Sequence, residues 1–234
     1  MSDLILFVGL GNPGKSYAQN RHNVGFMAID RIASKYDFPA YKEKSNYSIS
    51  KGIIDDQKVF LVKPSTYMNL SGEAVKAVTK FYRIEANNTT VFHDELDIKQ
   101  GICKIKVGGG HAGHNGLRSI NQHIGPNYRK LRIGIGHPGQ KDLVSKYVLS
   151  DFKETDQIWL NGVLNDIADN FPKLVTNDHS GFLNLRSNTK KEKLNFHNTS
   201  YIEGEKENTK KTKALKNLPS IDTAIRNLYQ KFKK

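Results

Sequence analysis

The pattern of hydrophobic and polar positions predicts alternating strands and helices along most of the chain. Apolar or alternating runs typical of strands occupy residues 4–8, 47–62, 89–92, 101–107 and 130–135. Helical spacing of apolar residues occupies 24–33, 71–82, 116–123 and 151–174, the last with a break near Pro172. Residues 47–62 are read as a hairpin that turns at residues 55–57. The pattern therefore predicts an α/β fold with a mixed, twisted β-sheet flanked by helices. In the segment 71–82, the expected apolar stripe is Ala74, Val75, Val78, Phe81 and Tyr82.

The character of the chain changes after about Arg186. Residues 188–234 hold 12 Lys/Arg and 5 Asp/Glu, and few apolar residues up to a short amphipathic pattern that follows Ser220. We therefore expect a single domain over residues 1–187 and a basic, flexible extension over 188–234 that ends in a short amphipathic helix. The extension is either an additional contact to RNA or a partner, or a solubilising appendage; the sequence leaves both open.

Charge and cysteine content restrict the classes of function. The formal net charge is +13 and the isoelectric point about 9.6, which favours a polyanionic partner without separating RNA from DNA or a membrane surface. Cys103 is the only cysteine, which excludes an intramolecular disulfide and a cysteine-based zinc site. The first residues lack the features of a signal peptide, and no apolar run approaches the roughly 18 residues of a membrane span. We therefore expect a soluble, cytoplasmic protein with no membrane partner.

The glycine-rich segment 9–16 fits the spacing of both a phosphate loop and a dinucleotide fingerprint. Its context argues against both. A phosphate loop leads directly into a helix, whereas the next helical pattern starts only around Val24. A nicotinamide site needs an acidic residue after the second strand, but Asp30 lies within that predicted helix. The segment is then either a glycine-rich turn without a ligand or part of a site that binds neither a nucleoside triphosphate nor a dinucleotide.

Five polar segments fall where predicted strands end and are expected to form one site. They comprise residues 9–14, 17–23, 63–72, 92–97 and 108–116. Open α/β sheets place ligand sites at such strand ends. The segments are rich in asparagine, histidine and glycine and poor in carboxylates and thiols. This mixture suits a hydrolase that orients a neutral ester or amide beside an imidazole base, without a metal.

These segments, together with a sixth at residues 131–139, carry the strings Val8-Gly-Leu-Gly-Asn-Pro-Gly, Tyr17 with Arg21-His-Asn, Tyr67-Met-Asn-Leu-Ser-Gly, His93-Asp-Glu-Leu-Asp, Gly108-Gly-Gly-His-Ala-Gly-His-Asn-Gly-Leu and Leu131-Arg-Ile-Gly-Ile-Gly-His-Pro-Gly. From about residue 4 to about residue 186, the chain thereby resembles the bacterial-type peptidyl-tRNA hydrolases. The resemblance implies a cytoplasmic monomer, without metal or cofactor, that cleaves the ester between a nascent peptide and the 3′ ribose of tRNA. The implied partner is tRNA, and the ribosome is a further candidate.

The resemblance also implies roles for individual residues. His22 corresponds to the catalytic base and Asp94 to the carboxylate that orients it, a pairing that suits proton transfer near neutral pH. Asn12, Asn69 and Asn115 correspond to residues that hold the peptide and the esterified end of the tRNA. The residue matching Asn12 is linked to discrimination at the α-nitrogen. Each amide offers two donors and an acceptor without charge.

Further positions imply contacts with the tRNA itself. Tyr17 and Tyr67 match tRNA-contacting residues, and an exposed aromatic ring can stack on the unpaired 3′ end; the alternative is a core aromatic. Lys104, Lys106 and Arg132 resemble the clamp for the 5′ phosphate, and we call these three residues the phosphate clamp. The alternative for them is a solvated basic face.

Two remaining features receive structural interpretations. His111 and His114, with His93 elsewhere, suggest a metal site, but the spacing is loose and no clear third ligand follows. His114 is instead expected to contact substrate or to support residues that do. Cys103 alternates with lysines in a strand pattern and is expected to pack rather than act as a nucleophile. The principal rival to the hydrolase is a non-catalytic RNA-binding protein on the same fold, and a nucleotide-dependent enzyme is a distant third.

Overall fold

The computed structural model describes residues 4–178 and Phe182. The strands are β1 (Ile5–Gly9), β2 (Lys42–Glu43), β3 (Tyr47–Ile54), β4 (Gln57–Pro64), β5 (Thr89–Glu95), β6 (Cys103–Val107) and β7 (Arg129–Gly134). The α-helices are α1 (Val24–Lys35), α2 (Ser71–Tyr82), α3 (Asn115–Ile124), α4 (Val144–Val148), α5 (Gln157–Asp169) and α6 (Phe171–Val175). Short 3₁₀ turns at Lys15–Tyr17, Arg21–Asn23 and Met68–Leu70 occupy loops that follow β1 and β4.

The strands in the described part of the chain form one seven-stranded sheet in the order β2-β3-β4-β1-β5-β7-β6. The four central strands β4, β1, β5 and β7 are parallel, while β2, β3 and β6 pair antiparallel at the edges. Asp55 and Asp56 make the hairpin turn between β3 and β4 with φ of 48° and 63°. Two consecutive positive φ values are the geometry that matches the twist of a tight hairpin. The mixed, twisted sheet that the sequence predicts is thus confirmed.

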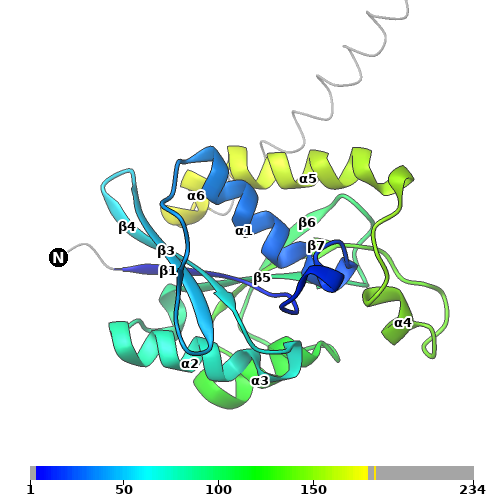
Figure 1. Ribbon diagram of the computed structural model, residues 1–234, viewed down its shortest axis with the longest axis horizontal. Helices are drawn as coiled ribbons and strands as arrows, with labels where there is room; N and C mark the ends of the chain where they lie inside the picture. Colours follow the sequence, from blue (N-terminus) through cyan, green and yellow to red (C-terminus); the bar gives the residue numbers. More distant parts are fainter. Residues whose placement is uncertain (1–3, 179–181, 183–234) are drawn as a thin grey trace, which may run out of the picture. The chain divides into compact units, whose positions relative to one another are not determined.

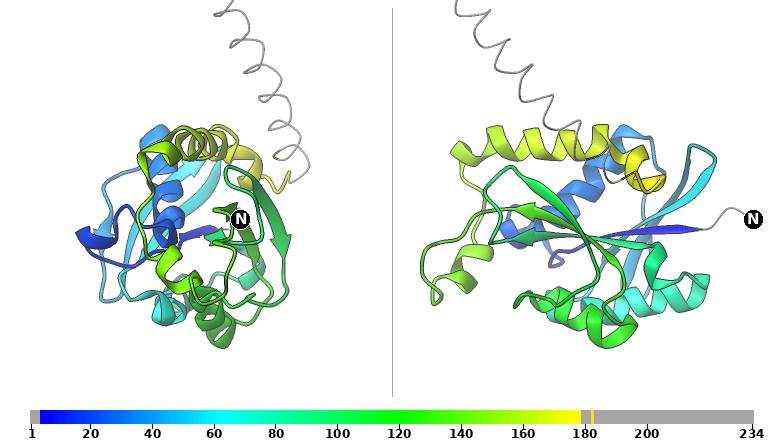
Figure 2. Two further views of the ribbon diagram at one scale, coloured as in Figure 1. Left: turned by 90° about the vertical axis from the view of Figure 1, so that its right-hand side faces the viewer. Right: turned by 180° about the vertical axis from the view of Figure 1, so that it is seen from behind.

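Helices cover both faces of the sheet: α1, α5 and α6 lie on one face, and α2 and α3 on the other (Figures 1 and 2). β1 shows why two layers form, because its period-two alternation sends successive side chains to opposite faces. Ile5 and Phe7 pack into the core under α1 and α5, whereas Leu6 and Val8 pack under α2 and α3. All five residues of β1 are buried, as expected for a central parallel strand.

Most predicted elements are confirmed, and the exceptions have local causes. The break in the last helical segment falls at Asn170, so that Pro172 lies in the first turn of α6, where its missing N–H costs no hydrogen bond. Phe81 was expected in the apolar stripe of α2 but is 74% exposed; it lies in the last turn of the helix, where its ring packs edge-on against that of Tyr82. The sequence pattern did not predict the short elements β2 and α4. Cys103 is buried in β6, as predicted for a packed strand residue.

The predicted extension over residues 188–234 lies outside the described residues, as does the boundary at residue 187. Among the helices of the described part, none is long and apolar enough to cross a membrane.

Candidate active site

The segments singled out by sequence meet at the carboxyl ends of the central parallel strands. Asn12 follows β1, Asn69 follows β4, and Asp94 lies near the end of β5. A cavity of about 960 Å³ opens at this edge of the sheet. Its lining includes these predicted residues: Asn12, His22, Tyr67, Asn69, Asp94, His114 and Asn115. Residues from all five segments thus line one cavity, and its role as the functional site stays a prediction.

His22 reaches the cavity because the start of α1 presses against the sheet backbone. A Cβ atom on Gly25 would lie 2.3 Å from the carbonyl oxygen of Phe92 and 2.5 Å from the backbone nitrogen of Leu10. Only glycine allows this approach, since real Cβ contacts are never so short. The 3₁₀ turn Arg21–Asn23 immediately before α1 is therefore held beside the end of β5. The helix start at Val24 also contradicts a phosphate loop, which would open a helix directly at its glycines.

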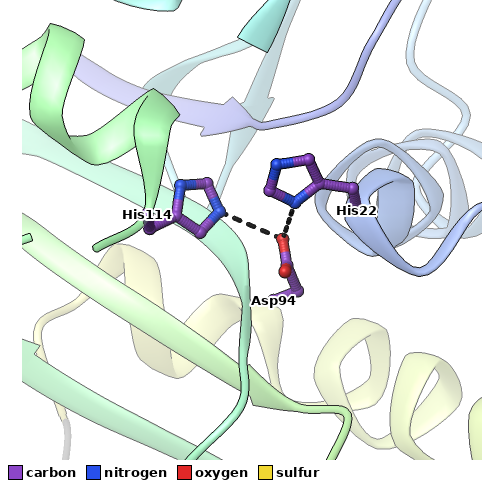
Figure 3. Close-up of side chains that lie close together, drawn as sticks. All are labelled: His22, Asp94 and His114. Atoms are coloured by element: carbon purple, nitrogen blue, oxygen red, sulfur yellow. Dashed lines mark hydrogen bonds and ion pairs between the residues drawn. The ribbon is translucent and has the colours of Figure 1, made fainter. Parts of the chain in front are cut away.

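His22 and Asp94 form a buried pair at the base of the cavity. The Nδ1 atom of His22 lies 2.8 Å from Oδ1 of Asp94, although the two residues are 72 positions apart in the chain (Figure 3). Burial works to lower the pKa of His22, but the charge of Asp94 and its hydrogen bond raise it, and the net pKa is raised. Burial works to raise the pKa of Asp94, but His22 and His114 together hold it well below its usual range. Asp94 is therefore a carboxylate that accepts from His22.

His114 is the second neighbour of Asp94. Its Nε2 atom lies 3.0 Å from the same Oδ1 atom (Figure 3). On its other side, Nδ1 accepts from the backbone N–H groups of Gly116 at 3.1 Å and Leu117 at 3.4 Å, which makes His114 the N-cap of α3. One carboxylate oxygen thus lies between two imidazoles.

A third histidine, His93, also lines the cavity, but its environment differs. Its Nδ1 atom hydrogen-bonds to the carbonyl oxygen of Asp94 at 2.8 Å. Burial, followed by the charge of His114, lowers the pKa of His93 to about 3. His22 combines a raised pKa with a carboxylate partner and a place on the cavity wall. These properties are those expected of a general base.

The ligand atoms of His22, Asp94 and His114 lie within 4.8 Å of one another, the spacing of a possible metal site. Their hydrogen bonds do not suit a metal. An imidazole that binds an ion through Nε2 carries its proton on Nδ1. On His114 that proton would face the N–H groups of Gly116 and Leu117, which donate to the same atom. The cluster has the geometry of a hydrogen-bonded base, which agrees with the interpretation that the histidines do not form a metal site.

Asn12 is fixed on three sides. Its Oδ1 atom accepts from the backbone N–H of Met68 at 2.8 Å, which settles the orientation of the amide. Its backbone N–H donates to Oδ1 of Asn23 at 2.9 Å, and the Nδ2 group of Asn23 donates to its carbonyl oxygen at 2.9 Å. Asn69 and Asn115 lie at the exposed rim of the same cavity. Asn23 was not predicted as a site residue; its only signal is its place next to His22 in the string Arg21-His-Asn.

A further part of the cavity wall comes from α4 and the adjoining Leu149, and the sequence did not predict it. Val144, Val148 and Leu149 contribute apolar surface there. Arg21 links this wall to His22: its backbone N–H donates to the carbonyl oxygen of Ser150 at 3.0 Å, and its Nη2 atom pairs with Asp156 at 2.7 Å. This ion pair is almost fully buried, with side-chain exposures of 5% and 11%.

The tyrosines and the phosphate clamp lie nearer the surface. The rings of Tyr17 and Tyr67 meet edge to face with centroids 6.5 Å apart, and Tyr67 is 58% exposed, which excludes a core role for it. Within the phosphate clamp, Lys104 on β6 and Arg132 on β7 are cross-strand neighbours and therefore lie on the same face of the sheet. The Nε atom of Arg132 donates to Glu95 at 2.9 Å, so part of its charge is already balanced.

Lys130, which was not predicted, is the cross-strand neighbour of Lys106 on the same face as the clamp. Its ammonium donates to the carbonyl oxygens of Gly108 at 2.9 Å and Gly109 at 3.3 Å, and it lies 4.1 Å from the centre of the Tyr128 ring. Burial and the charge of Lys106 lower its pKa to about 8. Lys130 therefore anchors the glycine loop that carries His111 and His114.

A model of the family described as peptidyl-tRNA hydrolase matches residues 6–194, which is most of the chain. The chain belongs to the peptidyl-tRNA hydrolase family. It is 52% identical over 182 residues to the peptidyl-tRNA hydrolase of Dinoroseobacter shibae, covering 78% of this chain and 77% of that protein. It is 50% identical over 181 residues to the peptidyl-tRNA hydrolase of Mesorhizobium japonicum, covering 77% and 75%.

Solved structures agree with the family and the fold. A crystal structure of peptidyl-tRNA hydrolase from Acinetobacter baumannii matches with a TM-score of 0.74 at 43% identity, covering 79% of this chain and 94% of that chain. The predicted family, fold and reaction are confirmed: this peptidyl-tRNA hydrolase cleaves the ester between peptide and tRNA. Nothing in these comparisons favours the non-catalytic RNA-binding alternative. The roles of individual site residues stay predictions.

Proposed function

We propose that the enzyme hydrolyses peptidyl-tRNA with a water molecule that His22 activates and that Asp94 makes His22 competent to do so. The observation that carries the proposal is the buried hydrogen bond between Nδ1 of His22 and Oδ1 of Asp94. Because Nδ1–H donates to the carboxylate, the lone pair of neutral His22 lies on Nε2, which Figure 3 shows directed away from Asp94. His22 lines the cavity, so this atom is placed to take a proton from water.

The steps follow from this geometry. Water attacks the ester carbonyl carbon while Nε2 of His22 takes its proton, and the imidazolium that forms is stabilised by the charge of Asp94. The tetrahedral intermediate then collapses. The C–O bond to the tRNA breaks, and His22 returns the proton to the departing ribose oxygen. The products are a peptide with a free carboxylate and a tRNA with a free 3′ end.

Asn12 is proposed to select substrates with an acylated α-nitrogen. Its oxygen already accepts from Met68, so the group that it offers the substrate is the amide Nδ2–H₂, a donor. A peptidyl or N-acetyl group carries a carbonyl oxygen that accepts such a bond. A free α-ammonium has only donors and would be left without a partner there. Asn69 and Asn115 at the rim are proposed to hold the peptide and the 3′ end.

The tRNA is proposed to lie outside the cavity, with its unpaired 3′ end on Tyr67 and Tyr17 and a phosphate on the clamp. The exposed ring of Tyr67 beside Asn69 supports the first contact, and the shared sheet face of Lys104 and Arg132 supports the second. From the family we also propose a cytoplasmic monomer that has the ribosome as a further partner. A dimer in light scattering would contradict the monomer, and failure to co-sediment with ribosomes would contradict that partner.

The proposal is tested by release of labelled N-acetyl-aminoacyl groups from tRNA in the presence of EDTA. Wild type should cleave this substrate and spare unblocked aminoacyl-tRNA. His22→Ala should lose at least about 100-fold in kcat, the lower end of what a positioned general base contributes, while tRNA binding measured by filter retention persists. Turnover near the wild-type value in that variant would contradict the role of His22. A matched His123→Ala variant removes a histidine at the far end of α3 and should keep turnover.

A further inference from the structure

His114 uses both of its polar atoms inside the protein. Nδ1 accepts from the N–H groups of Gly116 and Leu117 at the start of α3, so that atom carries a lone pair. A neutral ring then carries its hydrogen on Nε2, which lies 3.0 Å from Oδ1 of Asp94. The direction of this hydrogen bond is therefore fixed: His114 donates and Asp94 accepts. With both nitrogens engaged, the ring has no polar atom left for substrate.

We propose that His114 is a positioning residue: the first turn of α3 fixes it as the Nε2–H tautomer, and in that form it holds the carboxylate of Asp94 in place for His22. The proposal rests on the function proposed above for His22. Of the two roles expected for His114, contact with substrate and support of residues that contact it, the proposal selects support, because His114 acts on the reaction only through Asp94.

The bond from His114 restrains the carboxylate of Asp94, which the bond to His22 alone does not. A buried carboxylate needs donors, and one that is held by a single bond can rotate about its side chain. Here Oδ1 of Asp94 accepts from two rings on separate segments, His22 before α1 and His114 before α3. The two rings lie with their centroids 4.8 Å apart. The second donor fixes the direction from which Asp94 meets His22.

The tautomer of His114 is selected by the groups that hydrogen-bond to its ring, and other charged and titratable groups lie around the same cavity. A proton added to Nδ1 of His114 would face two backbone N–H groups at the positive end of a helix. The ring centroids of His93 and His114 are 5.1 Å apart, and the Arg132–Glu95 ion pair joins the neighbouring strands β7 and β5. Arg118, one turn into α3, and His111, Asp97, His137 and Lys141 line the same cavity. Asp94 is the carboxylate that His114 contacts.

The decisive variant is His114→Asn. Asparagine is among the best N-cap residues, so it preserves the start of α3, but it is too short to repeat the bond to Asp94. We expect kcat to fall by about 10- to 100-fold, the factor that corresponds to one hydrogen bond to a charged group, with little change in KM. A raised KM with unchanged kcat would overturn the proposal in favour of substrate contact.

The pH profile supplies a readout that loss of structure would not imitate. Without His114, the charge of Asp94 acts on His22 alone, and water reaches a site that is now less buried. Both changes raise the pKa of His22, so the acidic limb of kcat should move to higher pH. His111→Asn is the matched control, because His111 accepts from Gly113 in the same loop, and it should keep the wild-type limb. An unmoved limb in His114→Asn would contradict the proposal.

Nitrogen-15 NMR of histidine-labelled full-length protein separates this proposal from that for His22. The signals lost in His114→Asn identify His114 in the wild type, and their shifts should show Nδ1 unprotonated and Nε2 protonated at pH 7.5. The opposite tautomer would overturn the positioning role whatever the kinetics show. If His22→Ala stayed active while the NMR result held, the proposal for His22 would fail and the hydrogen-bond assignment for His114 would stand.

Discussion

Replacing Asp94 with asparagine changes the charge next to His22 with little change in shape. The Oδ1 atom that accepts from His22 at 2.8 Å and from His114 at 3.0 Å can keep both hydrogen bonds as an amide oxygen. What disappears is the negative charge opposite the imidazolium that forms in the reaction. Leaving one member of a buried ion pair without its partner typically costs about 3–5 kcal/mol, which converts to a loss of roughly 10²- to 10⁴-fold in kcat.

The same variant should shift the pH dependence in a defined direction. In the wild type, burial lowers the pKa of His22 but the charge and hydrogen bond of Asp94 outweigh it. In Asp94→Asn the charge that raises the pKa of His22 is gone, while the burial that lowers it stays. The pKa of His22 therefore falls, and the acidic limb of kcat moves to lower pH. This shift is opposite to the one expected for His114→Asn, so the two variants test different contacts.

The measurement is kcat against pH from 5 to 9 with N-acetyl-aminoacyl-tRNA at saturating concentration. Asp97→Asn is the control, because it removes an exposed carboxylate from the same cavity wall without altering the bond to His22. It should keep both kcat and the acidic limb within about twofold, since exposed charges are screened. Wild-type kcat with an unmoved limb in Asp94→Asn would refute the view that Asp94 orients and stabilises His22.

The pair also links protonation to stability. The depressed pKa of Asp94 gives stability that is present above its unfolded value of about 3.9 and is lost as pH falls toward the folded value. The raised pKa of His22 gives stability that is present below about 6.5 and is lost as pH rises through the folded value. When the pH falls from 4 to 2, the free energy of unfolding measured with urea should therefore decrease less for Asp94→Asn than for the wild type.

Three further predictions concern the rest of the molecule. Asp156→Asn leaves the buried charge of Arg21 without its partner at 2.7 Å and should lower the free energy of unfolding in urea by about 3–5 kcal/mol. Asp169→Asn, which removes the partner of exposed Lys35, should lower it by under about 1 kcal/mol. Equal losses in the two variants would contradict the importance of burial. Replacing all three clamp residues with glutamine should raise KM and reduce the salt slope of tRNA binding by about 2–3, and an unchanged slope would remove the clamp. We propose that residues 1–187 suffice for catalysis and that residues 188–234 add RNA affinity through their charge. Truncation after residue 187 should then keep kcat and raise KM. An unaltered KM would contradict this role of residues 188–234.

The local patterns of the sequence predicted the elements of the fold well. Strand and helix periods are properties of neighbouring residues, so the run around β1 and the helical spacing of α2 are visible without any tertiary information. The residue types at strand ends likewise predicted a hydrolytic site with an imidazole base. Phe81 shows the limit, because period alone does not tell whether the last turn of a helix still faces the core.

Residue type alone does not single out His22 as the proposed base; that proposal rests on the family resemblance and on the tertiary structure. His22, His93 and His114 are chemically identical in the sequence, and their differences arise from burial and from their partners, which for His22 is Asp94, 72 positions along the chain. Those partners meet because the parallel order β4-β1-β5-β7 brings strand ends together and because Gly25 lets α1 approach the sheet. Sequence periodicity specifies which side of an element is buried, but only packing between elements sets the distances and burial that give each imidazole its own chemistry.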